Sequence, residues 1–266
     1  MRVSSPLAAS NGGWIHRDAN QETPRPATRQ VQAEPETRLT LAEVSQLVDQ
    51  CSHHPRAHEF RSELADKLLV PYKSLHDLRV GCGYDERRGE WYSTWSERDA
   101  ARRFVGLVRR YADGSKKTYR NTQHGLIYAD DMPAGEWMLL PEGGSDTAAI
   151  LGLSLPVIGR PSNLGGLAEL VKYCKLHRFQ QYRKVVVVLG EHDFRSNADC
   201  GDCMNCGRCW PGRFGAIQTA KRLQAAGINA WWSLLPDAKD ARAWIAEHFW
   251  MSGKEFMSVV RKHSLK

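Results

Sequence analysis

Two stretches of the chain decide its fold: Trp137-Met-Leu-Leu-Pro-Glu-Gly-Gly-Ser-Asp146 and Lys184-Val-Val-Val-Val-Leu-Gly-Glu-His-Asp193. Each is a short apolar run that stops at a group of acids. Such a run is typical of a strand that is buried on both faces, as in the centre of a parallel sheet. Ligands of parallel sheets bind beyond the carboxyl ends of the strands, which is where Glu142 and Glu191 fall. The two stretches therefore predict an acidic site at one edge of a parallel sheet.

The acids of these stretches have the chemistry of a site for a hard divalent cation. Asp193 follows Glu191 by two residues, so their side chains point the same way if the chain stays extended. Gly143 and Gly144 let the backbone turn sharply beside Glu142. Mg²⁺ prefers carboxylate oxygens and waters, and it takes the rest of its shell from substrate phosphates. Because carboxylates without partner cations repel one another, the pattern predicts a metal ion among them.

Helices and strands are expected to alternate around the two acidic stretches. The apolar pattern predicts helices over 146–153 and 164–176, with a short strand and turn between them at 156–161. Together with the two apolar strands, this gives the order strand, helix, strand, helix, strand. That order implies a parallel sheet with helices on its faces.

The two ends of the chain differ in character. Residues 1–38 are rich in Ser, Pro, Gln, Asn and Thr, and they are predicted to be a disordered tail because they bury too little surface to offset the entropy of ordering. At the other end, 241–250 is predicted to be an amphipathic helix, and 251–266 a second, basic helix. The residues of the first helix that are expected to face inward are Trp244, Ile245 and Phe249.

Residues 39–135 are predicted to form a smaller region of helices followed by an antiparallel sheet. Thr40, with Glu43 three residues later, makes a capping box at the start of the first helix, and a second helix follows Pro55. Between residues 90 and 128, aromatic and β-branched residues alternate with polar ones, as in antiparallel strands. This stretch is strongly basic: Arg102, Arg103, Arg109, Arg110, Lys116, Lys117 and Arg120.

The acidic stretches resemble the Toprim domain shared by bacterial and phage primases, type IA and type II topoisomerases and some nucleases. The first family motif, a hydrophobic strand with Glu-Gly and a later Asp, is matched by Glu142-Gly-Gly-Ser-Asp146. The second, a hydrophobic strand ending in Asp-x-Asp, is matched by Glu191-His-Asp193, whose first acid is one methylene longer. Residues 215–223 are similar to the primase helix that follows. Asp240, after the apolar run 231–235, matches the first acid of a third primase motif.

The resemblance continues upstream into the basic half of the primase polymerase core. Residues 104–110, 113–117 and 124–128 are similar to that half, so that the likeness covers roughly residues 75–250. The implied fold is α/β. A Toprim domain over 136–250, with a central, mainly parallel sheet flanked by helices, would follow the smaller helical and antiparallel-sheet region.

The resemblance implies a primase of the phage or plasmid kind, which makes short RNA primers on single-stranded DNA from ribonucleoside triphosphates during replication. Its acids would hold Mg²⁺ or Mn²⁺: Glu142, Asp146, Glu191, Asp193 and Asp240. Three basic residues would contact nucleotide or template: Arg110, Lys116 and Lys117. The sequence has no Gly-x-x-x-x-Gly-Lys-Ser/Thr phosphate loop, so a replicative helicase would be a separate chain.

Two other functions remain open on the same residues. A Toprim nuclease would keep the metal site and cleave phosphodiesters, with Glu142 as general acid or base. A non-catalytic module would bind single-stranded DNA or a replication partner. Substitution of Glu142 by Gln separates these classes, because it would abolish catalysis but leave pure binding intact.

A Cys-rich insertion at 199–213 follows the second acidic stretch. Its four cysteines recur every third residue and are predicted to be zinc ligands: Cys200, Cys203, Cys206 and Cys209. Cys-x-x-Cys pairs form the knuckles of many zinc sites. An iron–sulfur cluster and free or redox-active thiols are the alternatives.

Composition limits the function classes further. The net charge of +7 and the pI of about 9.1 favour a polyanionic partner such as nucleic acid. No apolar run approaches the roughly 18 residues that a membrane span needs, and the first residues do not form a secretory signal. The expected location is therefore the cytoplasm, without membrane contact.

Overall fold

The computed structural model describes residues 38–197, 200, 201, 203 and 206–266. The tail predicted at 1–38 lies outside these residues except for its last position. Within the described ranges, no helix combines the length and the apolar character needed to cross a membrane.

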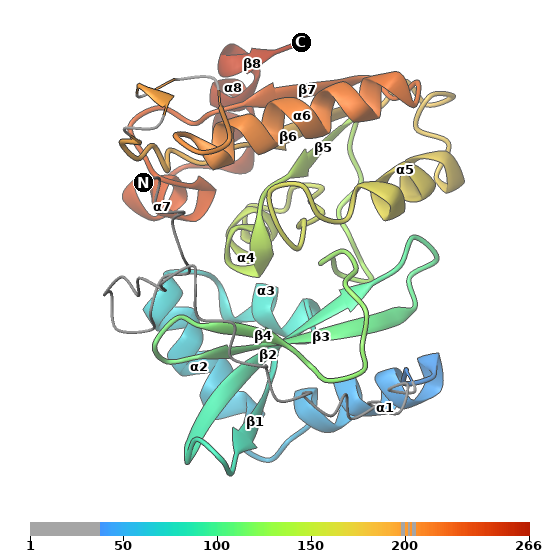
Figure 1. Ribbon diagram of the computed structural model, residues 1–266, viewed down its shortest axis with the longest axis vertical. Helices are drawn as coiled ribbons and strands as arrows, with labels where there is room; N and C mark the ends of the chain where they lie inside the picture. The colour runs from blue at the N-terminus through green and yellow to red at the C-terminus, as the bar shows by residue number, and fades with distance from the viewer. Residues whose placement is uncertain (1–37, 198–199, 202, 204–205) are drawn as a thin grey trace, which may run out of the picture. The chain divides into compact units, whose positions relative to one another are not determined.

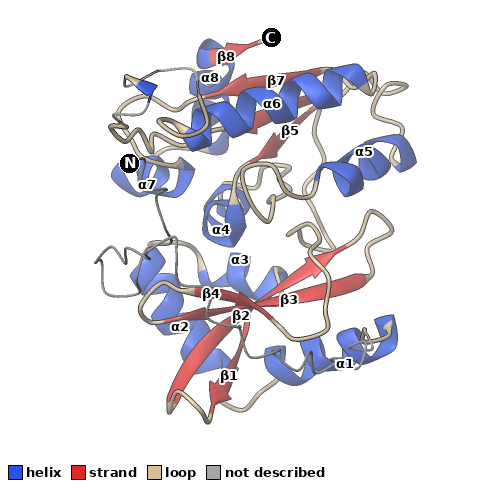
Figure 2. Ribbon diagram, in the orientation of Figure 1, coloured by secondary structure: helices blue, strands red, loops and turns tan. Residues whose placement is uncertain are grey.

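Three helices and an antiparallel sheet make up the first half of the described chain (Figure 2). The helices are α1 (Leu41–Ser52), α2 (Ala57–Leu68) and α3 (Tyr72–Asp77). The strands pair in sequence order as β1 (Gly81–Asp85), β2 (Glu90–Arg98), β3 (Phe104–Tyr111) and β4 (Lys116–Thr118). Helix α1 packs against β1 and β3. The predicted capping box is confirmed: Thr40 Oγ1 accepts from the Glu43 N–H, and Glu43 Oε2 accepts from the Thr40 N–H.

The second half of the chain forms a mainly parallel sheet flanked by helices, so the predicted α/β fold class is confirmed. Its strands, in spatial order, are β5 (Trp137–Leu140), β6 (Val185–Leu189), β7 (Ala230–Ser233) and β8 (Ser264–Leu265). The first three are parallel, and β8 is antiparallel to β7. The helices are α4 (Gly143–Gly152), α5 (Leu167–Leu176), α6 (Pro211–Ala225), α7 (Ala241–Glu247) and α8 (Gly253–His263).

Strand β6 is buried on both faces, as its apolar run predicts. Val187 belongs to the hydrophobic cluster that contains Ile150 of α4, whereas Val186 and Val188 belong to the cluster that contains Leu223 of α6. All three valines are fully buried. Helix α6 accordingly runs along β6 and β7 (Figure 1). Because side chains alternate along a strand, a continuous apolar run serves both layers of helices.

Isolated bridges link the two sheets. The predicted strand at 156–161 forms only such bridges: Val157 pairs with Leu139, Gly159 with Ile127, and Arg160 with Glu142. Leu126 in turn bridges to Arg98 at the end of β2. Through these bridges, Arg160 lies beside the end of β5. The domain boundary expected between residues 135 and 136 stays a prediction.

The helix predicted over 241–250 is shorter than expected, and Phe249 does not face inward. Helix α7 ends at Glu247. His248 Nδ1 lies 2.8 Å from the Trp244 carbonyl oxygen, and its ring stacks on the Trp244 indole. Beyond this point the helical spacing no longer applies, and Phe249 is 83% exposed. Trp244 is buried, as predicted.

Three other predicted helices differ in their bounds. The helix expected over 164–176 begins at Leu167, as α5. The basic helix expected over 251–266 ends at His263, because Ser264 and Leu265 join the sheet as β8. The helix expected from 146 begins three residues earlier, as α4, directly after Glu142.

Candidate active site

The acids predicted from the sequence gather at the carboxyl ends of the parallel strands. Glu142 follows β5 as the N-cap of α4, and Asp240 follows β7 as the N-cap of α7. Glu191 and Asp193 follow β6. Since the three strands are parallel, their ends meet at one edge of the sheet. Each of Glu142, Asp193 and Asp240 acts electrostatically on Glu191.

Two glycines make the turn after Glu142 possible. Gly143 has a φ of +77°, which residues with side chains rarely adopt. A Cβ on Gly144 would collide with the indole of Trp95 in β2. The Gly-Gly pair thus lets the end of β5 and the start of α4 pass close to the antiparallel sheet.

Glu142 is a partly buried acid, and one of its carboxylate oxygens lacks a hydrogen-bond partner in the described part of the chain. Burial raises the pKa of its carboxyl, and the nearby cations Arg160 and Lys116 act in the opposite direction. Among the described residues, the buried atom Glu142 Oε2 has no hydrogen-bond partner. A buried carboxylate oxygen without a partner is costly, so a cation or a proton donor is expected to bind there.

The carboxyl of Glu191, like that of Glu142, has a raised pKa. Burial raises its pKa to about 7, the carboxylates of Glu142, Asp240 and Asp193 add to the rise, and Lys239 opposes it. Asp193 is tied down, because its Oδ1 accepts from the Gly212 N–H of α6 at 2.9 Å. Like charges gathered in a half-buried site favour uptake of a proton or a cation.

Asp146 occupies a more interior position than the other acids. It is 4% exposed, and its Oδ1 accepts from the Arg242 N–H at 2.8 Å. This bond joins α4 to the first turn of α7, which begins after Asp240. Burial raises the pKa of Asp146 well above its ordinary value, and Asp240 adds to the rise. The hydrogen bond from the Arg242 N–H to Asp146 therefore positions α7.

The donor set fits a hard divalent cation that keeps part of its water shell. Among the described residues, no three carboxylates bring their oxygens within 4.8 Å of one another; only three thiols meet that condition. Mg²⁺ is usually bound through one or two carboxylates, waters and substrate phosphates. Separate carboxylates, with the unpartnered Glu142 Oε2 among them, suit such binding.

Two of the three predicted basic residues face this site. Burial lowers the pKa of Arg110, in β3, and the nearby carboxylates of Asp146 and Asp240 act in the opposite direction. Lys116 of β4 acts on Glu142, and its Nζ lies 3.8 Å from an ideal Cβ on Gly143. Arg110 and Lys116 line one small cavity of about 40 Å³ together with Gly143 and Gly144. The antiparallel sheet therefore presents cations to the acids.

Lys117 lies on the other side of β4. Side chains alternate along a strand, so Lys117 points away from the side that Lys116 occupies. Its Nζ lies 5.9 Å from the centre of the Tyr111 ring. Its predicted contact with nucleotide or template stays a prediction.

The sequence did not single out two cations of the site. Arg160 is fully buried, donates to the Leu189 carbonyl oxygen at 3.0 Å, and acts on both Glu142 and Glu191. Burial lowers its pKa to about 10. Lys239, next to Asp240, acts on the same two acids. Arg160 follows an apolar run, as Glu142 and Glu191 do, which is the one signal that could have drawn attention to it.

The Cys-rich insertion brings three of its four thiols together. The Sγ atoms of Cys200, Cys206 and Cys209 all lie within 4.8 Å of one another. Cys203, the fourth predicted ligand, is not part of this group.

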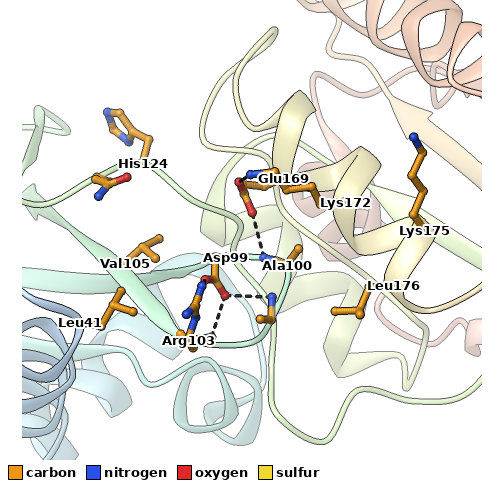
Figure 3. Close-up of a pocket in the computed structure, with 12 residues that line it drawn as sticks. Leu41, Asp99, Ala100, Arg103, Val105, His124, Glu169, Lys172, Lys175 and Leu176 are labelled. Atoms are coloured by element: carbon orange, nitrogen blue, oxygen red, sulfur yellow. Dashed lines mark hydrogen bonds and ion pairs between the residues drawn. The ribbon is translucent and has the colours of Figure 1, made fainter.

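A separate cavity of about 820 Å³ lies between the end of β2 and α5 (Figure 3). Four of its charged residues pair with one another: Arg103 with Asp99, and Lys172 with Glu169. Glu169 also accepts from the Ala100 N–H. None of the predicted site residues lines this cavity.

Comparison with solved structures identifies the fold. The chain is similar to the zinc-binding and RNA polymerase domains of the Aquifex aeolicus primase, with a TM-score of 0.58 and 14% identity over 85% of this chain and 60% of that one. The chain has the fold of a primase catalytic core. The E. coli primase catalytic core gives a TM-score of 0.55 at 13% identity, covering 84% of this chain and 80% of that one. A DnaG primase catalytic domain bound to single-stranded DNA gives 0.54 at 12% identity, with the same coverage.

These structural likenesses support the Toprim-containing primase resemblance at the level of the fold. No family model matches the sequence, and no curated protein matches it. The chain spans 60% of the length of the Aquifex structure.

Proposed function

We propose that this chain is a primase-like nucleotidyltransferase that makes short RNA primers on single-stranded DNA. Its substrates would be ribonucleoside triphosphates, its cofactor Mg²⁺ or Mn²⁺, and its partner a replicative helicase on another chain. The observation that carries the proposal is the meeting of acids and cations within a primase-core fold. Glu142, Glu191 and Asp240 from the parallel sheet meet Arg110 and Lys116 from the antiparallel sheet.

The acids would bind the cation, with Glu142, Glu191, Asp193 and Asp240 as the ligands. When bound, the cation offsets the charge of the triphosphate and of the leaving pyrophosphate, and it favours ionisation of the primer 3′ hydroxyl. Asp146 positions the first turn of α7 and thereby Asp240.

The basic side chains near the acids have two proposed roles. Arg110 and Lys116 would bind nucleotide or template phosphates, and their shared cavity beside Gly143 and Gly144 supports this role. Arg160 lies beneath the acids, fully buried, and offsets the repulsion between Glu142 and Glu191. Transfer to a hydroxyl nucleophile requires no covalent intermediate on a side chain.

The experiment is primer synthesis by the purified protein on single-stranded DNA, with labelled ribonucleotides and Mg²⁺ or Mn²⁺. The test variant is Glu142→Gln, which keeps the size of the side chain but not its charge. The control is Glu247→Gln, at the exposed end of α7. Short RNA made by the parent and the control, but reduced by at least a hundredfold in Glu142→Gln, supports the proposal.

Two other outcomes would replace it. Metal-dependent nicking of the DNA without RNA synthesis would assign the site to phosphodiester cleavage. Retention of single-stranded DNA without either reaction, by the parent and by Glu142→Gln alike, would make the chain a binding module.

A further inference from the structure

The thiols of Cys200, Cys206 and Cys209 form a compact set of sulfur ligands outside the acid site. The Cys200 Sγ lies 2.7 Å from the Cys209 Sγ and 3.6 Å from the Cys206 Sγ. Cys209 is fully buried. The Cys209 N–H donates to the Cys206 Sγ at 3.4 Å, so the Cys206-x-x-Cys209 turn folds back on its own sulfur. Backbone donors of this kind favour the thiolate, which is the form that binds metal.

The turn that carries these sulfurs leads directly into contacts with the acidic strand end. Trp210, the residue after Cys209, is the N-cap of α6. Its Nε1 donates to the Glu191 carbonyl oxygen at 2.8 Å. The Arg195 N–H donates to the Cys209 carbonyl oxygen, also at 2.8 Å. Two hydrogen bonds, to Trp210 and to Cys209, therefore hold the stretch of chain from Glu191 to Arg195.

The same segment fixes the second acid. The Gly212 N–H, in the first turn of α6, donates to Asp193 Oδ1. A Cβ on Gly212 would lie 2.8 Å from the Glu191 Cβ and 2.9 Å from Asp193 Oδ1, so the helix and the acidic loop are in close contact. The positions of both acids thus depend on how the chain enters α6 from Cys209.

We propose that Cys200, Cys206 and Cys209 bind one Zn²⁺, and that this zinc-held turn positions Glu191 and Asp193 through Trp210 and Gly212. Zinc binds thiolates in structural sites at short distances, and it requires no redox step. Each thiol that binds loses its proton to solvent. The zinc site stands on the geometry of the sulfurs alone. Its effect on the acids rests on the proposed function.

Metal content tests the first half of the proposal. The full chain, purified under reducing conditions, is analysed for zinc, iron and sulfide beside Cys206→Ser and Cys174→Ala. Cys174 is a buried thiol of α5 that does not belong to the cluster, so its variant is the matched control. The expected result is one zinc per chain in the parent and the control, and at least a fivefold loss in Cys206→Ser. Iron with sulfide, a Cys200–Cys209 disulfide, or zinc that Cys206→Ser retains would overturn it.

Binding of Mn²⁺ alone, followed by electron paramagnetic resonance, tests the second half. Trp210→Phe keeps an aromatic ring but removes the bond to the Glu191 carbonyl oxygen. It is expected to keep its zinc and to bind Mn²⁺ about five- to tenfold more weakly. Zinc removal from the folded parent by a chelator is expected to have the same effect, with unchanged helix content by circular dichroism.

Each failure has a different meaning. Mn²⁺ affinity that is unchanged by Trp210→Phe and by zinc removal would overturn the positioning role. A parent protein that holds zinc but binds no Mn²⁺ would instead overturn the acid site of the proposed function, and with it the positioning role. Primer synthesis that needs no more Mn²⁺ after zinc removal than before it would leave the proposed function intact while overturning the positioning role.

Discussion

Glu191 gives the protein a pH dependence that runs opposite to that of an ordinary surface acid. Its pKa is raised from 4.5 to about 7 in the folded chain. Between these values the unfolded chain has lost the proton while the folded chain retains it, so the free energy of unfolding falls as pH rises through this window. We expect a fall of about 1–2 kcal/mol from this group between pH 5 and pH 8, after solvent screening. Urea unfolding without divalent ions at these two pH values measures it.

The matched variants for this prediction are Glu191→Gln and Glu247→Gln. The first should lose part of the fall, and the second should follow the parent. The raised pKa values of Glu142 and Asp146 act in the same direction, so a smaller fall remains in Glu191→Gln. Saturating Mn²⁺ should flatten the curve at high pH, because the cation takes the place of the proton. Equal slopes for the parent and Glu191→Gln would show that this acid is not buried as described.

Arg160 supports a second prediction at the residue scale. The side chain is fully buried, donates to the Leu189 carbonyl oxygen, and is flanked by Glu142 and Glu191. Arg160→Met leaves those acids without their buried partner and should lower the free energy of unfolding by about 3–5 kcal/mol. Arg160→Lys keeps the charge but loses the planar donor geometry, so an intermediate loss is expected. Urea unfolding of both variants at pH 8 tests the order; equal stability of Arg160→Met and the parent would contradict it.

The acids and Arg160 differ in how far the sequence reveals them. Glu142 and Glu191 stand at the ends of apolar runs, and local pattern places them at strand ends. Arg160 comes to the site through isolated bridges between distant segments. No periodicity within its own stretch encodes that pairing, so its burial beneath the acids could not be predicted.

At the scale of elements, local signals were predictive where one segment determines its own structure. The strands β5 and β6 and the capping box of α1 follow from apolar runs and from Thr40 and Glu43. The exposure of Phe249 and the pairing of β8 do not. The first depends on His248 ending α7 against Trp244, and the second on hydrogen bonds to β7, some thirty residues away in sequence. Both are contacts that a local pattern does not contain.

The α1 capping box gives a prediction at this scale. Thr40→Ala removes the oxygen that accepts from the Glu43 N–H, and it should lower the free energy of unfolding by about 1 kcal/mol. Gln46→Ala, in the exposed middle of the same helix, is the control and should change stability by a few tenths of a kcal/mol at most. Urea unfolding measures both. A loss of equal size in the two variants would mean that the cap contributes nothing specific.

At the scale of the whole molecule, the net charge of +7 conceals a separation of charge. The parallel sheet gathers acids at its carboxyl edge, while the antiparallel sheet presents Arg110 and Lys116 to them. Composition predicted a polyanionic partner but not this arrangement, because it arises only when the two sheets come together. A phosphate chain that enters between them would meet cations on one side and the acids proposed to bind metal on the other.

Binding of single-stranded DNA therefore should depend on salt through particular residues. Each cation that contacts a phosphate contributes about 0.7 to the slope of log K against log salt for single strands. Arg110→Ala and Lys116→Ala should each reduce the slope by about that amount, whereas Lys254→Ala, on the exposed side of α8, should leave it unchanged. Fluorescence anisotropy of a labelled oligonucleotide between 50 and 200 mM salt gives the slopes. If Lys254→Ala lowers the slope as much as Lys116→Ala does, binding follows the overall charge, and the cations beside the acids have no special part in holding the strand.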